Sequence, residues 1–209
     1  MEIYVLRSGY PDLTKLFVGG LHGKEWKVTK PILKKFIMNG MTNAYGKIII
    51  IPKITHSNRS KYISTLKEAY YKTLEGKRLL KLIQKYNPDI YVELHCYRKS
   101  AYNVLTDPQR LAKKNVPPLV EIKNGVLIGS VSPHLLSIYH FKLSLVLEVC
   151  CKFSAEAEET VLELLKDLGE ARSYNEILDR WLRKYPNQIN IATKLYYNWF
   201  KKYGQTFRV

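Results

Sequence analysis

The chain has 209 residues, of which 46% are apolar and 25% charged, as in an ordinary globular protein. It has no run of about 18 apolar residues to span a bilayer, no signal-like N-terminus and too few cysteines for a disulfide framework, so we expect a cytoplasmic protein with no membrane partner. The net charge of +16 comes from scattered lysine pairs without a basic tail or an aromatic ladder, which disfavours nucleic acid as a partner.

The first half of the chain alternates between expected strands and helices. Strands are expected at residues 2–7, 15–18, 47–51 and 90–94, and helices at 24–39 and 61–86. The continuous apolar run at 47–51 is typical of a strand buried on both faces of a sheet. Pro31 indicates a kink or a restart of the first helix, and Gly76 an interruption of the second.

The second half begins with a proline-rich stretch and ends in helices. Residues 107–118 are expected to form a surface loop, 119–128 and 143–149 one strand each, and 155–168, 173–185 and 188–203 helices. Ser173 and Glu176 form a capping box for one of these helices. Strands that alternate with helices predict an α/β domain with a mostly parallel central sheet. We expect a single domain, with an α/β core over 1–153 and a helical segment over 154–209 packed on it.

A zinc site is predicted where two expected strands end. His22 and Glu25 follow one strand and lie three residues apart, so that both side chains point the same way. Another strand leads directly into His95, and ligands gather at the carboxyl ends of strands in an open α/β sheet. Two histidines and one glutamate are a common catalytic zinc set. Glu93 faces the same side of its strand as His95 and is expected to accept the other ring N–H.

Further polar residues follow the expected strands. Glu148 is a carboxylate inside an apolar strand, and burial of such a charge costs free energy. A carboxylate at this position therefore indicates a function such as that of a general base. Asn58 and Arg59 come after the strand at 47–51, where an arginine fork beside an amide suits a substrate carboxylate or a developing oxyanion. Arg98, three residues after His95, is a candidate second contact for an anion.

These motifs occur in the order found in zinc carboxypeptidases, and the sequence most resembles the succinylglutamate desuccinylase and aspartoacylase branch. The motifs are Gly-x-His-Gly-x-Glu (Gly20 to Glu25), Asn-Arg (Asn58-Arg59), Glu-Leu-His (Glu93 to His95) and Leu-Glu (Leu147-Glu148). They span roughly residues 14 to 150. Lys24 stands where this branch has Asn, and Glu93 where it has Asp. Helices replace the C-terminal β-rich domain of the branch, and an archaeal subfamily is a further expectation.

The resemblance implies a three-layer zinc-carboxypeptidase-like fold and one zinc ion per chain, held by His22, Glu25 and His95. Glu148 would be the general base that takes a proton from the attacking water, and the Asn-Arg pair would bind a carboxylate of the substrate. The implied activity is hydrolysis of an amide bond in a small acidic N-acyl amino acid or peptide. An oligomer is compatible with the sequence.

Two other functions stay open at this stage. A non-catalytic module that keeps the fold and the metal would bind a partner through an exposed aromatic face on the last helix, formed by Tyr196, Tyr197, Trp199 and Phe200. A basic nucleic-acid binder is the third hypothesis. A cysteine role in the site, through Cys96 beside His95 or through Cys150, is disfavoured.

Overall fold

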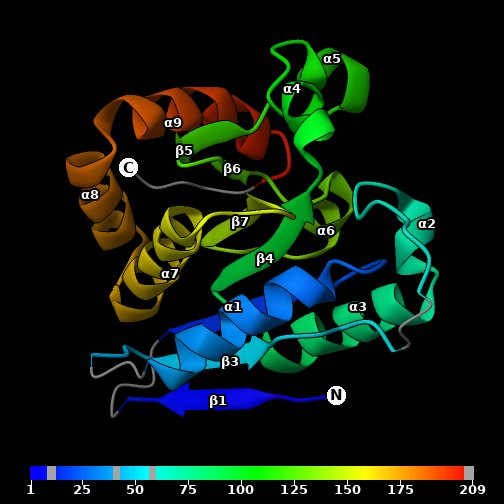
Figure 1. Ribbon diagram of the computed structural model, residues 1–209, viewed down its shortest axis with the longest axis vertical. Coiled ribbons are helices and arrows are strands. Elements are labelled where there is room, and N and C mark those ends of the chain that lie inside the picture. The colour runs from blue at the N-terminus through cyan, green and yellow to red at the C-terminus, as the bar shows by residue number, and fades with distance from the viewer. Residues whose placement is uncertain (9–12, 40–42, 57–59, 205–209) are drawn as a thin grey trace.

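The computed structural model describes residues 1–8, 13–39, 43–56 and 60–204, and its described strands form one seven-stranded sheet (Figure 1). The strands are β1 (Tyr4–Arg7), β2 (Thr14–Gly19), β3 (Lys47–Ile51), β4 (Ile90–Tyr97), β5 (Val120–Lys123), β6 (Val126–Gly129) and β7 (Leu143–Cys150). Their order in the sheet is β1-β3-β2-β4-β7-β6-β5. In these ranges no helix is both long enough and apolar enough to cross a membrane.

The four central strands are parallel and the edges are antiparallel. Strands β3, β2, β4 and β7 pair in parallel, so that all four end at the same edge of the sheet. Strand β1 runs antiparallel to β3, and β5, β6 and β7 form antiparallel pairs. The prediction of one strand over 119–128 was wrong, because Asn124 and Gly125 adopt left-handed conformations and turn the chain into a hairpin.

Helices cover the sheet and carry the connections between its strands. They are α1 (Trp26–Met38), α2 (Glu68–Tyr71), α3 (Leu74–Tyr86), the 3₁₀ turn η1 (Lys99–Ala101), α4 (Tyr102–Leu105), α5 (Arg110–Lys114), α6 (Pro133–Ile138), α7 (Ala155–Glu170), α8 (Tyr174–Lys184) and α9 (Pro186–Lys201). The stretch expected as a loop at 107–118 therefore contains a short helix. Helix α1 runs through Pro31 without a break.

The helix expected at 61–86 starts later than predicted, and its interruption lies just before Gly76. Helix α2 begins only at Glu68, and the break lies between α2 and α3, where Thr73 caps α3 by accepting a hydrogen bond from the Gly76 N–H. Gly76 lies inside α3, and a Cβ there would stand 2.1 Å from the Tyr70 carbonyl oxygen. Glycine at this position thus permits close packing of α2 on α3 and does not end a helix.

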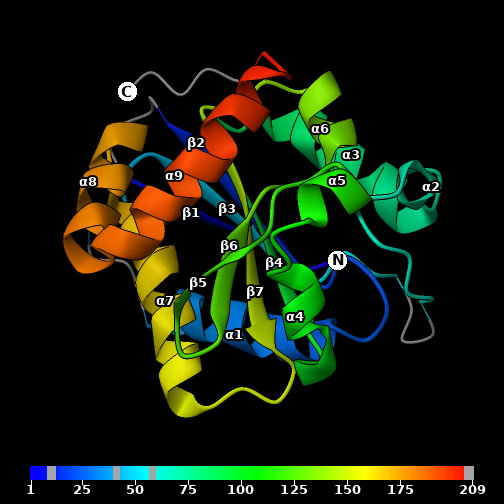
Figure 2. The same ribbon diagram turned by 90° about the horizontal axis from the view of Figure 1, so that it is seen from above.

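The helices lie on both faces of the sheet, so the predicted α/β layers are confirmed. On one face Phe17 of β2 contacts Phe36 of α1, and helices α1 and α7 pack against each other. On the other face α6 lies beside α2 and α3, through the ring contact of Tyr71 with His134 (Figure 2). The buried side chains between the layers form one large apolar cluster that includes residues of α8 and α9.

The C-terminal helices α7 to α9 are packed onto the sheet. Ser154 caps α7 and Ser173 caps α8, as the sequence predicted. The expected exposed aromatic face on α9 is wrong, because three of its four aromatic side chains are buried against the core. Only Tyr197 is exposed, and the reason is that α9 covers β5 and β6 instead of facing solvent.

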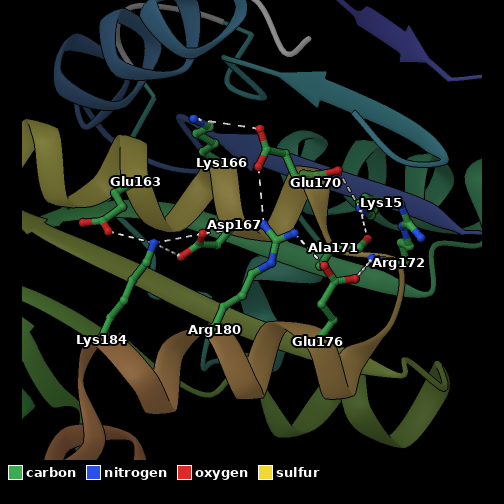
Figure 3. A network of polar contacts seen from close by, with 11 residues as sticks. Lys15, Glu163, Lys166, Asp167, Glu170, Ala171, Arg172, Glu176, Arg180 and Lys184 are labelled. Atoms are coloured by element: carbon green, nitrogen blue, oxygen red, sulfur yellow. Dashed lines mark hydrogen bonds and ion pairs between the residues drawn. The ribbon is translucent and has the colours of Figure 1, made fainter. Parts of the chain in front are cut away.

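A buried lysine joins the sheet to the end of α7. Lys15 is fully buried, and its Nζ donates hydrogen bonds of 2.7 Å to the carbonyl oxygens of Gly169 and Ala171 at the C-terminal end of that helix (Figure 3). The side chain thus satisfies carbonyl groups that the helix leaves without a partner. Arg180 of α8 adds ion pairs to Glu170 and Glu176 beside it.

Replacing this lysine is expected to lower stability. In Lys15→Met the two carbonyl groups are left buried without a donor, which should lower the free energy of unfolding by about 1–3 kcal/mol. Burial lowers the pKa of Lys15 to about 7 from 10.5, so between these values the unfolded chain binds more protons than the folded chain. The contribution of Lys15 to stability therefore rises as the pH increases from about 7 to 10.5, and it is at its lowest below pH 7, where both states are protonated.

Urea unfolding at pH 7 and at pH 9.5 measures both effects. The wild type should gain more stability over this pH interval than Lys15→Met. Lys72→Met is the matched control, because Lys72 is an exposed lysine that pairs with Glu68, and its loss should cost less than about 1 kcal/mol. The same pH dependence in the wild type and in Lys15→Met would contradict the lowered pKa.

Candidate metal centre

The turn after β2 brings His22 and Glu25 to the carboxyl edge of the sheet. Gly20 adopts a left-handed conformation with a φ of 58°, and a Cβ there would lie 2.8 Å from the Cβ of Trp26. The chain therefore needs glycine to fold back so tightly into α1. His22 and Glu25 are each 7% exposed, which buries both at the N-terminal end of that helix.

The Glu25 carboxylate is oriented by the backbone of the same turn. Its Oε1 accepts hydrogen bonds from the N–H groups of Leu21, at 2.6 Å, and His22, at 3.2 Å. Its Oε2 points to the two histidines instead, 3.1 Å from Nδ1 of His95 and 3.6 Å from Nδ1 of His22. One carboxylate oxygen is thus used by the fold, and the other is left facing two ring nitrogens.

His95 is held from its other side by Glu93. Both residues are on β4, and Oε2 of the fully buried Glu93 lies 2.9 Å from Nε2 of His95. The Tyr91 hydroxyl donates to Oε1 of Glu93 at 2.8 Å. This chain of contacts places the Nε2 proton toward Glu93 and directs Nδ1 toward Glu25. A carboxylate on the second ring nitrogen is common for metal-binding histidines.

The three donor atoms fit a zinc ion. One donor atom from each of His22, Glu25 and His95 lies within 4.8 Å of the others. Two ligands of a tetrahedral zinc ion at bond lengths of about 2.0–2.1 Å stand about 3.3 Å apart, close to the observed 3.1 and 3.6 Å. His22 Nδ1 is buried and has no hydrogen-bond partner among the described residues. A cation with nitrogen and oxygen ligands would satisfy it.

The protonation of the cluster also suits a cation. Burial lowers the pKa of His22 to about 4, so this imidazole is neutral at pH 7. Burial likewise opposes charge on His95 and on Glu25, but their mutual attraction outweighs it, raising the pKa of His95 and lowering that of Glu25. A proton on His95 thus balances the negative charge of the nearby carboxylates. A bound metal ion would supply this positive charge instead, and its binding would release the proton.

Glu148 lies directly beside this cluster. It is the register partner of His95 across the parallel β4–β7 pair, close to the carboxyl end of β7. Its Oε2 is buried without a hydrogen-bond partner in the part of the chain that the structure describes. Burial raises the pKa of Glu148 to about 7, which is a suitable value for a group that accepts a proton near neutral pH.

The cluster and Glu148 open into one cavity of about 1000 Å³. The basic side chains that line it are Lys24, Lys27, Arg98 and Arg110, and its acidic ones are Glu25 and Glu148. Arg98 is exposed and lines the cavity, as a candidate anion contact should. The predicted pair Asn58 and Arg59 lies outside the described residues.

Tyr62 and Arg110 are among the lining residues that were not predicted from the sequence. The ring of Tyr62 meets that of His22 edge-on, with centroids 4.6 Å apart. Arg110 is buried and belongs to α5, in the stretch expected to be a surface loop. A lone tyrosine or arginine in a loop carries no sequence signal, and only the folded chain places these side chains at the cavity.

Comparison with known proteins assigns the chain to a family. It belongs to the family described as "Uncharacterized protein conserved in archaea (DUF2119)", whose sequence model matches residues 11–201. It is 40% identical over 195 residues to the "Uncharacterized protein MJ0501" of Methanocaldococcus jannaschii, which covers 92% of this chain and 93% of that protein. The expectation of an archaeal family is therefore confirmed.

The solved structures similar to this chain include members of the branch that the motifs resemble. Murein-tripeptide amidase MpaA from Escherichia coli O157 is 14% identical with a TM-score of 0.47, over 81% of this chain and 87% of that one. Succinylglutamate desuccinylase from Vibrio parahaemolyticus is 14% identical with a TM-score of 0.43, over 82% of this chain and 72% of that one.

Proposed function

We propose that this protein is a zinc-dependent hydrolase that cleaves an amide bond in a small acidic N-acyl amino acid or peptide. The observation that carries the proposal is the convergence of His22, Glu25 and His95 beside the unpaired carboxylate of Glu148, in one cavity. Most buried polar atoms in folded proteins are hydrogen-bonded, and a metal ion with its bound water would satisfy both Nδ1 of His22 and Oε2 of Glu148.

The chain's own residues would have distinct roles. His22, Glu25 and His95 would hold the zinc, which would supply a Lewis acid that acidifies water and polarises the amide carbonyl. Glu93 would fix the ring orientation of His95. Glu148 would accept the proton of the attacking water and return it to the leaving amine. Its place opposite His95 in the register supports this role.

The charge of the cavity supports an anionic small-molecule substrate. Four basic and two acidic side chains among the described residues line it, and a zinc ion would add to the positive charge. The volume of about 1000 Å³ lies at the upper end of the range for small-molecule sites. Asn58 and Arg59 stay predicted contacts of the substrate carboxylate.

The non-catalytic alternative has lost the docking surface that was expected for it. A docking surface on α9 needs exposed aromatic side chains, and Tyr196, Trp199 and Phe200 are buried. Nucleic-acid binding gains no support either, because the basic residues that line the cavity surround the cluster of His22, Glu25 and His95.

A screen of N-acyl amino acids and short acidic peptides tests the proposal. The full-length protein is loaded with zinc, and release of the free amine is measured before and after the metal is removed with a chelator. We expect turnover of at least one acidic substrate, its loss on chelation and its recovery when zinc is restored. If metal analysis shows that the chelator has removed the bound metal and turnover is nevertheless unchanged, zinc dependence is contradicted.

A further inference from the structure

Arg110 is a buried cation at the wall of the candidate site. It is the first residue of α5, is 7% exposed and lines the same cavity as His95 and Glu148. One N–H of its guanidinium donates to the Pro117 carbonyl oxygen. Among residues 1–8, 13–39, 43–56 and 60–204, no carboxylate lies within ion-pair distance of it.

Such a group is costly unless it has an anion to bind. A buried charge needs a partner, and a guanidinium has five N–H groups in a planar fork that matches a carboxylate. Burial lowers the pKa of Arg110, and Glu148 acts in the opposite direction through its charge without forming an ion pair. The remaining N–H groups are therefore available to a carboxylate that enters the cavity.

The C-terminal helix α9 fixes the segment that carries Arg110. The Trp199 indole N–H donates to the carbonyl oxygen of Asn115 at 3.0 Å, and the Tyr196 hydroxyl donates to that of Pro118 at 2.6 Å. These contacts lie just beyond α5, on both sides of Pro117, which accepts the bond from Arg110. The guanidinium is thus held before any ligand arrives, and little conformational entropy is lost on binding.

Other cations of the cavity are less suited to this role. Lys24, Lys27 and Arg98 are all exposed, so water competes for their hydrogen bonds and screens their charge. Arg110 is the one basic side chain among the described lining residues that is buried.

We propose that Arg110 is the residue that selects a carboxylate on the substrate, while the scissile amide lies at His22, Glu25 and His95. This inference rests on the proposed function and adds the substrate class: a compound with a second carboxylate, which forms a two-point ion pair with Arg110. A carboxamide of the same shape would leave the buried guanidinium without a counter-ion. Arg110 therefore discriminates by charge and not by size.

Calorimetric binding to the zinc-loaded, full-length protein tests this inference without turnover. The probes are succinate and glutarate, each compared with its monoamide. One carboxylate of each probe is free to approach the zinc, and the other end carries either a carboxylate or an amide. In the wild type, at least one of the two dicarboxylates should bind about 10- to 100-fold more tightly than its monoamide.

Arg110→Gln is the decisive variant. Glutamine keeps a donor for Pro117 but removes the charge, and the preference for the dicarboxylate should fall to about 1; Arg110→Lys should keep part of it. Lys113→Gln removes an exposed charge from the same helix and should keep the full preference. An unchanged preference in folded Arg110→Gln, no preference in the wild type, or no binding of either dicarboxylate would overturn the inference.

These results are separable from the fate of the proposed hydrolase. A preference that depends on Arg110, without turnover of any substrate, would support the anion site and reject the hydrolase. Turnover of a substrate, together with a dicarboxylate preference that is unchanged in Arg110→Gln, would support the hydrolase and reject the anion site at Arg110.

Discussion

Glu148→Gln is expected to lower kcat/KM for the best substrate by about 10²- to 10⁴-fold, the usual contribution of a general base. The substitution keeps the shape of the side chain and removes its ability to take a proton. Glu148 is not part of the cluster of His22, Glu25 and His95, so zinc content should stay at the wild-type value. Steady-state kinetics and metal analysis of the same preparation measure both.

The pH profile of the wild type gives a second measure of this base. Glu148 acts only when it is deprotonated, so kcat/KM should rise as the pH increases through its pKa. Burial raises that pKa to about 7, and a nearby zinc ion would lower it, which places the acid limb of the profile below 7. Full activity of Glu148→Gln, or activity that falls as the pH rises from 5 to 7, would reject Glu148 as the base.

His22→Ala is expected to weaken zinc binding by more than about 100-fold. One of three protein ligands is lost, and Nδ1 of His22 has no hydrogen-bond partner among the described residues. The metal-free variant should also unfold at a lower urea concentration than the metal-free wild type, because the buried His22 ring packs against Tyr62, so zinc affinity is measured on protein shown to be folded. Competition with a chromophoric chelator measures the affinity.

His134→Ala is the matched control for this substitution. Both histidines contact a tyrosine ring, His22 that of Tyr62 at 4.6 Å and His134 that of Tyr71 at 4.5 Å, but only His22 lies in the cluster. Glu93→Gln should give an intermediate loss of about 10- to 100-fold, because it disturbs only the orientation of His95. Equal zinc affinity in the wild type and in His22→Ala would contradict the ligand assignment.

The sequence was sufficient to predict that the residues of the candidate site lie close together, because parallel strands end at the same edge of a sheet. The motif around His22, the His95 motif and Glu148 each follow or end an apolar run, and the structure places them together there. The caps at Ser154 and Ser173 were equally readable, since a serine hydroxyl at a helix start acts locally. Local chemistry and strand direction were sufficient for these features.

Features that depend on tertiary packing could not be predicted in this way. The burial of Arg110 follows from the contacts of α9 with residues 115–118, in which the contacting residues are 78 and 84 positions apart in the chain. The same packing buries Trp199, and helical periodicity alone does not say which face is covered. The hairpin at Asn124 is different, because an Asn-Gly pair is a strong turn signal and was present in the sequence.

Zinc-edge X-ray absorption spectroscopy of the zinc-loaded wild type tests the central claim most directly. The cluster of His22, Glu25 and His95 predicts one bound zinc per chain with only nitrogen and oxygen neighbours at about 2.0–2.2 Å, including the signature of imidazole rings. Cys96 and Cys151 line the same cavity and are the sulfur ligands that could compete. A sulfur shell at about 2.3 Å, or no zinc retained after loading, would contradict the site described for this protein.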